Sequence, residues 1–346
     1  MATVTCGYNA AGDALDWTTI PLAITNANAN DTIDCYYGDN ALGRRHAIGV
    51  QNIPKNLTIR GMLGNQECCF ADATRDIFNV TTASVTVILE NLTIQVGGSS
   101  DEAFFCGAAG ITLTMNRCRI IGGTYGIAGN NGYTATVNMC EFIWQYVASV
   151  RANNAGDVVT INNCAFLWPL TAITRVAGTI NCYNSVFACL TPTSGTVGGS
   201  NNATIRGTAP GTGVVTLLAV DMKTLYFGAG TYGACSLRPT SADCALVGAG
   251  TDRSLTTDID GETIDQSASA DVGPYSWAAL SSETPDYPDA GNVTEDDTTN
   301  GVTGTYHEAT EAEVEAGVTF GEDSGLTGTL EAGGGGSSFG MSGMIG

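Results

Sequence analysis

One short pattern occurs four times without gaps between residues 115 and 187, as Met115-Asn-Arg-Cys-Arg-Ile120, Val137-Asn-Met-Cys-Glu-Phe142, Ile161-Asn-Asn-Cys-Ala-Phe166 and Cys182-Tyr-Asn-Ser-Val-Phe187. The fourth positions of these copies are 22, 24 and 21 residues apart. A repeat of this length with no helical stretch is typical of one coil of a solenoid, in which each repeat stacks on the next. Two upstream segments, Asn56-Leu-Thr-Ile59 and Asn91-Leu-Thr-Ile94, extend the same frame toward the N-terminus.

Within each copy, apolar or small residues recur at every second position, as at Cys140 and Phe142. A period of two is typical of a strand with one buried face. The asparagine just before each strand suits a corner, because asparagine tolerates left-handed backbone and hydrogen-bonds its own chain. The pattern therefore predicts short parallel strands joined by tight corners.

Cysteine occupies the same inward position in three successive copies. In a parallel solenoid, equivalent positions stack about 4.8 Å apart. We therefore expect Cys118, Cys140 and Cys164 to form an inward ladder. Buried cysteine behaves as a small apolar residue, so packing is the favoured role. A redox or metal role is the alternative, and stacked rungs also bring two cysteines within disulfide range.

Composition restricts the class of protein. The chain has 346 residues, of which 45 are glycine and only 14% are charged, which disfavours long solvated helices. Its hydrophobic content of 43% excludes disorder throughout. No apolar run approaches the roughly 20 residues that span a bilayer. A net charge of −21 argues against nucleic acid or an anionic membrane as partner.

Charge and cysteine divide the chain in two. Residues 1–240 carry twelve basic and fourteen acidic residues, whereas residues 241–346 carry Arg253 alone against twenty acids. All twelve cysteines lie between Cys6 and Cys244. The sequence thus predicts a near-neutral body and an acidic C-terminal part.

The N-terminal residues MATVTCGYNAAGDALDW lack the basic and apolar regions of a secretory signal. Cysteines without export usually remain thiols. No C-x-x-C occurs, and the only histidines are His46 and His307, so we expect no metal site and no cofactor.

Three parts of the chain resemble right-handed parallel β-helix proteins of the pectate-lyase-like kind. They are the segment Trp17–Asn26 with the following Asn30-Asp-Thr-Ile33, the repeats above, and the terminal series Leu237-Arg-Pro-Thr-Ser241, Gly248-Ala-Gly250, Thr257-Asp-Ile-Asp-Gly261 and Asp271-Val-Gly-Pro-Tyr275. The first part is similar to a capping helix near Ile20–Thr25. The last part is similar to the terminal motif of bacterial and phage β-helix proteins. Pro274 and Ser276 differ from that motif, which has alanine and an acidic residue at these positions. The resemblance covers residues 15–277 and implies a fold rather than an activity, because this fold hosts lyases, hydrolases and inert fibres.

The expected fold class is all-β: a right-handed parallel β-helix with a cap helix and a small acidic C-terminal module. The domain boundaries follow as a cap at 1–31, the β-helix at 32–277 with strands from about Thr32 to Leu246, an acidic linker at 278–300, a small α/β module at 301–330 and a glycine-rich tail at 331–346.

The C-terminal module begins with Val302-Thr-Gly-Thr-Tyr306 and ends with Leu326-Thr-Gly-Thr-Leu330, a pair that resembles small modules of phage structural proteins. Between them, Thr310 is placed to cap a short helix that ends at Gly317. The tail carries apolar residues spaced by glycine and serine, and we assign assembly to Phe339, Met341 and Met344.

The sequence offers carboxylates but no catalytic motif. Glycoside hydrolysis needs two carboxylates about 5–9.5 Å apart. The candidates in the rungs do not share one register: Glu90, Asp101, Glu102, Glu141 and Asp157. We therefore predict no catalytic residue, although loop geometry leaves a dyad possible. Glu141, between Cys140 and Phe142, is expected on the outer face.

Arginines are the second group with possible chemistry. Arg117, Arg119 and Arg151 suit either the base of a lyase or an ion pair with Glu141 on the adjacent rung. The Gly43-Arg-Arg-His46 cluster is interpreted as a solvated turn or a cleft lining. Gly228-Ala-Gly-Thr-Tyr-Gly233 and Glu295-Asp-Asp297 are interpreted as turns rather than as dinucleotide and calcium sites.

Three functions are consistent with these features. The first is a non-enzymatic structural protein of a phage or virus-like particle that self-assembles, most simply as a homotrimer or lattice, with other virion proteins and surface glycans as further partners. The second is a carbohydrate-binding or polysaccharide-degrading tailspike-like enzyme. The third is a cell-surface adhesin or filament. Carboxylates clustered in a groove with aromatic platforms would favour the second function.

Overall fold

The computed structural model describes residues 2–7, 14–36, 46–47, 50–62, 69–72, 76–97, 101–217, 225–226, 237–239, 243–264, 270–276, 298–299 and 302–303. The chain forms two compact units, Met1–Ser282 and Glu283–Gly346. In the second unit, β28 (Thr298–Thr299) and β29 (Val302–Thr303) pair antiparallel, so a strand lies in the segment expected as a linker. The predicted helix after Thr310 and the tail lie outside the described residues.

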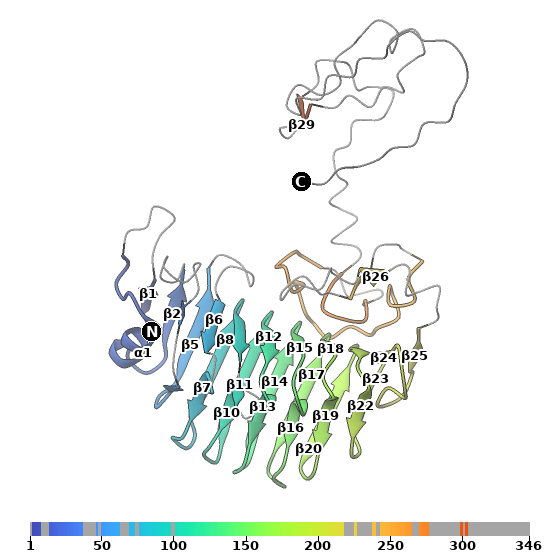
Figure 1. Ribbon diagram of the computed structural model, residues 1–346, viewed down its shortest axis with the longest axis horizontal. Coiled ribbons are helices and arrows are strands. Elements are labelled where there is room, and N and C mark those ends of the chain that lie inside the picture. The colour runs from blue at the N-terminus through green and yellow to red at the C-terminus, as the bar shows by residue number, and fades with distance from the viewer. Residues whose placement is uncertain are drawn as a thin grey trace, which may run out of the picture. The chain divides into compact units, whose positions relative to one another are not determined.

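Three parallel sheets build the first unit (Figure 1). In neighbour order, sheet 1 contains β1 (Thr3–Cys6), β2 (Asp31–Cys35), β5 (Leu57–Gly61), β8 (Thr86–Glu90), β11 (Ile111–Asn116), β14 (Tyr133–Asn138), β17 (Val158–Asn162), β20 (Thr179–Tyr183) and β23 (Gly198–Ser200). Sheet 2 contains β3 (His46–Ala47), β6 (Cys69–Asp72), β9 (Thr93–Val96), β12 (Arg119–Gly122), β15 (Glu141–Ile143), β18 (Ala165–Leu167), β21 (Val186–Ala188), β24 (Ala203–Thr204) and β25 (Val215–Thr216). Sheet 3 contains β4 (Gln51–Asn52), β7 (Phe78–Val80), β10 (Glu102–Cys106), β13 (Tyr125–Gly129), β16 (Ala148–Ala152), β19 (Thr171–Arg175) and β22 (Thr191–Ser194).

From β2 to β24 the chain visits sheets 1, 2 and 3 in turn and then repeats, so each of these coils adds one strand to each sheet in turn. The next strand, β25, joins β24 in sheet 2. Each strand pairs in parallel with the strand one coil away, as Met115 with Val137 and Val137 with Ile161. The predicted all-β parallel solenoid is therefore confirmed. Its strands are short because a corner follows every few residues.

The interior is filled by stacked side chains that face inward from all three sheets. The rings of Phe142 and Phe166 stack at 5.3 Å between centroids, and those of Phe166 and Phe187 at 4.8 Å. These residues occupy one register position of β15, β18 and β21, so the repeat that aligns them in sequence also aligns them in space.

One helix, α1 (Ile20–Asn26), packs against the first strands at the N-terminal end of the coil (Figure 1). Its buried side chains Ile20, Ala23 and Ile24 join the same apolar core as Cys6 and Ile33. The helix near Ile20–Thr25 was predicted, whereas β1, which lies ahead of it and pairs in parallel with β2, was not.

Left-handed backbone marks the corner between sheets 1 and 2. Asn91, Asn163 and Asn184 have φ of 54°, 50° and 48°, as asparagine at a corner should. Arg117 and Met139 take the same conformation on the rungs between them, so the position does not require asparagine.

The asparagine repeated inside the pattern instead forms a ladder of amides. Asn116 Nδ2 donates to Glu90 Oε1 (3.1 Å), Asn138 Nδ2 to Asn116 Oδ1 (2.9 Å) and Asn162 Nδ2 to Asn138 Oδ1 (2.8 Å). Arg253 closes the ladder by donating from Nε to Asn162 Oδ1 (3.0 Å). A carboxylate and a guanidinium thus complete the two ends of the row.

The terminal series does not continue the coil. Among the described residues, the last parallel strand is β25, which ends at Thr216, and β26 (Leu225–Tyr226) pairs antiparallel with β27 (Arg238–Pro239). Residues 243–264 and 270–276, here called the strap, fold back onto the outer face of sheet 2 (Figure 1). There Leu246 and Val272 pack against apolar residues of that face, which include Ile143 and Leu167. Residues 243–246, expected at the end of the coil, therefore belong instead to the strap, which buries the apolar outer face of sheet 2.

A charge introduced into the core provides a test of the solenoid register. Cys140 is fully buried between rungs, and Cys140→Asp would bury a carboxylate with no cation beside it. We expect the free energy of unfolding in urea to fall by about 3 kcal/mol or more. The matched control Val158→Asp, at a position 43% exposed on β17, should change it by less than about 0.5 kcal/mol. Equal effects of the two variants would contradict the register.

Candidate interaction site at a solenoid corner

The candidate site lies where strands of sheet 2 end and the chain turns toward sheet 3. Trp144 directly follows β15, and Trp168 directly follows β18. Both have positive φ, 59° and 55°, which is an outlier conformation for a bulky side chain. Each remains in the stack, because Trp144 N–H donates to Leu167 O (2.9 Å) and Trp168 N–H donates to Ala188 O (2.8 Å). Strain of this kind often accompanies a functional position.

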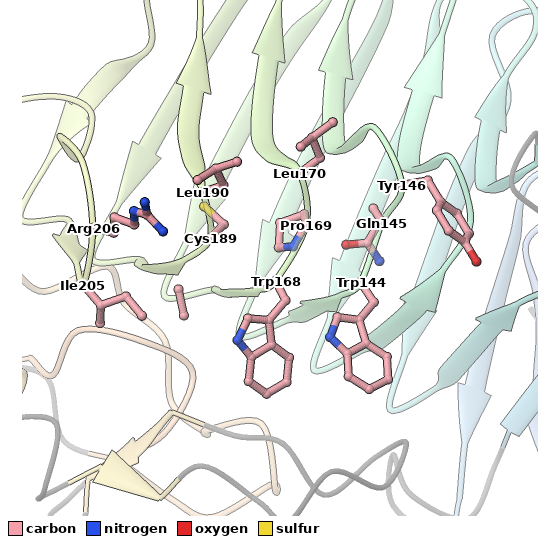
Figure 2. A pocket seen from close by; sticks show the side chains of 11 residues that line it. Trp144, Gln145, Tyr146, Trp168, Pro169, Leu170, Cys189, Leu190, Ile205 and Arg206 are labelled. Atoms are coloured by element: carbon pink, nitrogen blue, oxygen red, sulfur yellow. The ribbon is translucent and has the colours of Figure 1, made fainter.

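The two indoles project to the same side of the corner, one rung apart (Figure 2). Their ring centroids are 5.6 Å apart and their planes are inclined by 32°. The corner backbone thus presents a pair of aromatic rings along the axis of the coil.

An open groove of about 640 Å³, here called the corner groove, runs past these rings (Figure 2). It is lined by Trp144, Gln145, Tyr146, Trp168, Pro169, Leu170, Ala188, Cys189, Leu190, Ile205 and Arg206. Three of its apolar side chains are more than half exposed: Tyr146 (56%), Leu170 (53%) and Leu190 (54%). The groove therefore offers apolar surface in contact with water.

Gln145 is polar, but its amide is already used within the corner. Its Nε2 donates to Ile143 O (3.0 Å) and Ile120 O (3.1 Å), while Ser149 Oγ donates to its Oε1 (2.8 Å). Arg206 is then the charged residue of the lining. The groove is suited to an apolar or aromatic-stacking ligand rather than to a highly charged one.

Two carboxyls meet on earlier rungs of the same corner. Glu102 N–H donates to Asp76 Oδ1 (2.8 Å), and Thr124 N–H on the next rung donates to Asp101 O (2.7 Å). Burial, together with the Asp76 carboxylate, raises the pKa of Glu102 from 4.5 to about 8. A protonated carboxyl beside a carboxylate has the protonation states required for general acid–base chemistry. Of the predicted acids, the structure brings only Asp101 and Glu102 to this corner.

The other predicted acids have structural partners. Glu90 ends the amide ladder, and Asp157 accepts the backbone N–H groups of Asn153 (2.7 Å) and Asn154 (2.8 Å) in a turn. These two carboxylates therefore organise backbone and amides and lie apart from the corner groove.

Glu141 faces outward from sheet 2, as predicted, but the strap buries it fully. Arg119 Nε donates to Glu141 Oε2 (2.6 Å), and Tyr275 Oη of the strap donates to Glu141 Oε1 (2.8 Å). Burial raises the pKa of Glu141, and the Arg119 charge opposes that shift. The expected ion pair with the adjacent rung is thus made by Arg119. Arg151 instead donates to Tyr125 Oη (3.3 Å) and Asn153 Oδ1 (3.1 Å).

Arg117 lies beside a second, smaller hollow of about 230 Å³ between the amide ladder and the strap. Its lining is formed by Glu90, Asn116, Arg117, Asn138, Met139, Ser254, Leu255, Thr256 and Thr257. The arginines considered for a lyase therefore lie in separate surroundings and form no joint site.

The three ladder cysteines are buried in the core. Cys118 N–H points to Cys140 Sγ (3.3 Å) and Cys140 N–H to Cys164 Sγ (3.4 Å), while Cys164 N–H donates to Ser185 Oγ (3.0 Å). Burial raises the pKa of the Cys118 and Cys140 thiols, so both stay protonated. All three cysteines are free thiols with no disulfide between them.

Several predicted sites lie outside the described residues. They are the arginines of the Gly43–His46 cluster, the glycine-rich turn at 228–233, the acidic run at 295–297 and the assembly residues Phe339, Met341 and Met344. Where the structure does describe the chain, it shows no group of three His, Cys, Asp or Glu placed to hold a metal. Within the same residues, no helix has the length and apolar character needed to cross a bilayer.

Sequence reasoning missed the corner tryptophans, although a signal was present. Alternation predicts a polar residue after the inward Phe142 and Phe166, but the chain continues with Ile143-Trp144 and Leu167-Trp168. Three successive apolar residues at the same place in two aligned repeats indicate that both faces of the strand, and its corner, are apolar.

The fold and the groove define a parallel β-solenoid protein with an exposed aromatic corner. Compared with family models, curated proteins and solved structures, the chain matches none. The solenoid therefore rests on the structure, and the resemblance to pectate-lyase-like and phage proteins stays a prediction from the sequence.

The raised pKa of Glu102 predicts how stability depends on pH. In the unfolded chain Glu102 loses its proton near pH 4.5, and in the folded chain near pH 8, so the folded state holds the extra proton between these values. Stability should therefore fall as pH rises from 5 to 8. Glu102→Gln, measured by urea unfolding at several pH values, should remove this part of the slope.

Asp16→Asn is the control for this pH dependence. Hydrogen bonds from Thr5 lower the pKa of Asp16, so that group is ionised in both states throughout this range. Its replacement should leave the slope unchanged. A Glu102→Gln chain with the wild-type slope would show that Glu102 is not the group responsible.

Proposed function

We propose that this protein is a non-enzymatic structural component of the surface of a phage or virus-like particle and that it self-assembles through its C-terminal region. The observation that carries the proposal is the corner groove, where Tyr146, Leu170 and Leu190 are each more than half exposed. Exposed apolar side chains gathered along one groove are suited to contact with another apolar surface, so the groove favours an association role.

The body suits a structural role because its rungs repeat one contact many times. In such repeat architectures stability is roughly a sum over rungs and their interfaces. We expect the coil to be right-handed, as nearly all parallel crossover connections are. A decoration, fibre or tail position on a virion, with other virion proteins as further partners, follows from the phage-like resemblance of residues 301–330.

Truncation after Asn300 tests the proposal. Residues 301–346 are acidic and carry the apolar tail, and we expect their removal to abolish self-association in sedimentation velocity while the β-rich circular dichroism spectrum is kept. A shortened chain that assembles as the full chain does would make the C-terminal region a passive extension and would refute the proposal.

A carbohydrate-binding or carbohydrate-cleaving protein is the second candidate, favoured by one observation. The Asp76–Glu102 pair lies at the same corner as the aromatic rings, with Glu102 two rungs before Trp144. A proton-sharing carboxyl pair and aromatic rings along one corner are suited to a long glycan chain.

Incubation with pectin, alginate and capsular glycans tests this second candidate. On the structural proposal we expect no release of reducing ends or unsaturated uronates. Turnover that disappears in both Asp76→Asn and Glu102→Gln, but persists in the control Asp157→Asn, would establish the enzyme instead.

A further inference from the structure

The corner groove requires a particular kind of occupant. The Gln145 amide is already hydrogen-bonded within the corner, and the exposed side chains of the lining are mainly apolar. An occupant must therefore supply apolar side chains. An extended segment with small residues between them could run along the corner, past successive rungs about 4.8 Å apart.

One segment of the chain has these properties. Residues 332–346 contain no charged side chain, although the C-terminal region around them is strongly acidic. Phe339, Met341 and Met344 are separated by glycine and serine, which allow an extended backbone to approach a surface closely. Methionine sulfur makes favourable contacts with aromatic rings, which Trp144 and Trp168 present.

We propose that the corner groove of one copy binds the tail, residues 331–346, of a neighbouring copy. The inference rests on the proposed function, because it names the two surfaces through which the self-association occurs. Phe339 and the two methionines bury against Trp168, Leu170 and Leu190, so that these exposed side chains leave water together.

Chain length allows this contact between copies. Residues 277–338 separate the end of the strap from Phe339, which is 62 residues. Even as a flexible coil such a segment has an end-to-end distance of about 40 Å, and its acidic charge extends it further. The tail can therefore reach a groove on another molecule.

Charge favours the same pairing. Residues 142–217, the rungs that form the corner groove, carry Arg151, Arg175 and Arg206 against Asp157 alone. The arriving region, residues 277–346, is acidic, with thirteen acids and no lysine or arginine. The attraction between the two regions should steer the tail toward this part of the coil and weaken with salt.

The contact joins two different surfaces, so it is head-to-tail. Such contacts close into rings when the rotation permits and otherwise continue as filaments. A ring of three copies or an open lattice are both outcomes of this one interface.

The experiment compares the full-length chain with two variants, one substituted in the tail and one in the groove. The tail variant carries Phe339→Ser, Met341→Ser and Met344→Ser, and the groove variant carries Trp168→Ala. We expect each variant to show a dissociation constant of self-association at least about tenfold higher than that of the wild type in sedimentation velocity. Val176→Ser is the matched control, because Val176 is 63% exposed and does not line the groove, and it should associate as the wild type does.

Mixing the two variants decides whether the contact is between copies. The groove variant keeps an intact tail and the tail variant keeps an intact groove. An equimolar mixture should therefore form a dimer in which the tail of the groove variant occupies the groove of the tail variant. A mixture that stays monomeric would mean that the tail binds within its own chain, and this would overturn the proposal.

Further results separate this inference from the proposed function. If both variants associate like the wild type while truncation after Asn300 abolishes association, the groove–tail contact is wrong and the C-terminal assembly stands. If the truncated chain also associates, both are wrong. Should Trp168→Ala fail to fold, Leu190→Ser, at a position 54% exposed, carries the same test.

Discussion

The parallel pairing of each strand with the strand one coil away is the constraint on which the structure depends. Because the pairs are in register, any side chain at a given position meets its counterpart on the next rung. This places Phe142, Phe166 and Phe187 in one stack and gives the core its continuity. The same constraint acts at the corners, where it sets Trp144 beside Trp168 at 5.6 Å.

The corners differ in how well their residues suit left-handed backbone. Asparagine at positions such as Asn163 adopts it readily, whereas a tryptophan with positive φ costs roughly 1–2 kcal/mol. The hydrogen bonds of Trp144 and Trp168 to the next rung help to offset that cost. Trp144 also packs against the apolar cluster between sheet 2 and the strap. Trp168 is 40% exposed at its strained position, which is consistent with a binding role.

The strap turns an outward face into an interior. Arg119 and Glu141 would be surface charges on a bare coil, but they pair beneath Tyr275 with almost no exposure. A buried ion pair adds little net stability compared with apolar residues of similar size, whereas breaking it leaves a costly unpaired charge. The Tyr275 hydroxyl thus links the strap to the ion pair, and the apolar contacts of Leu246 and Val272 supply the burial.

The sequence by itself determined the period of the coil, the alternation of its strands, the inward position of Cys118, Cys140 and Cys164, and the separation of a neutral body from an acidic C-terminal region. These features are local or periodic, so they can be read from spacing. The tertiary structure alone decided that Tyr275 covers Glu141 across 134 residues, that the Glu102 backbone bonds Asp76, and that the residues after β15, β18 and β21 form a groove. Alternation states whether a side chain points into or out of a strand, but it carries no information about which distant segment lies over the outer face. The contacts that the strap and the corners make with an outward residue set its environment. They therefore also set its charge state and its availability to a partner.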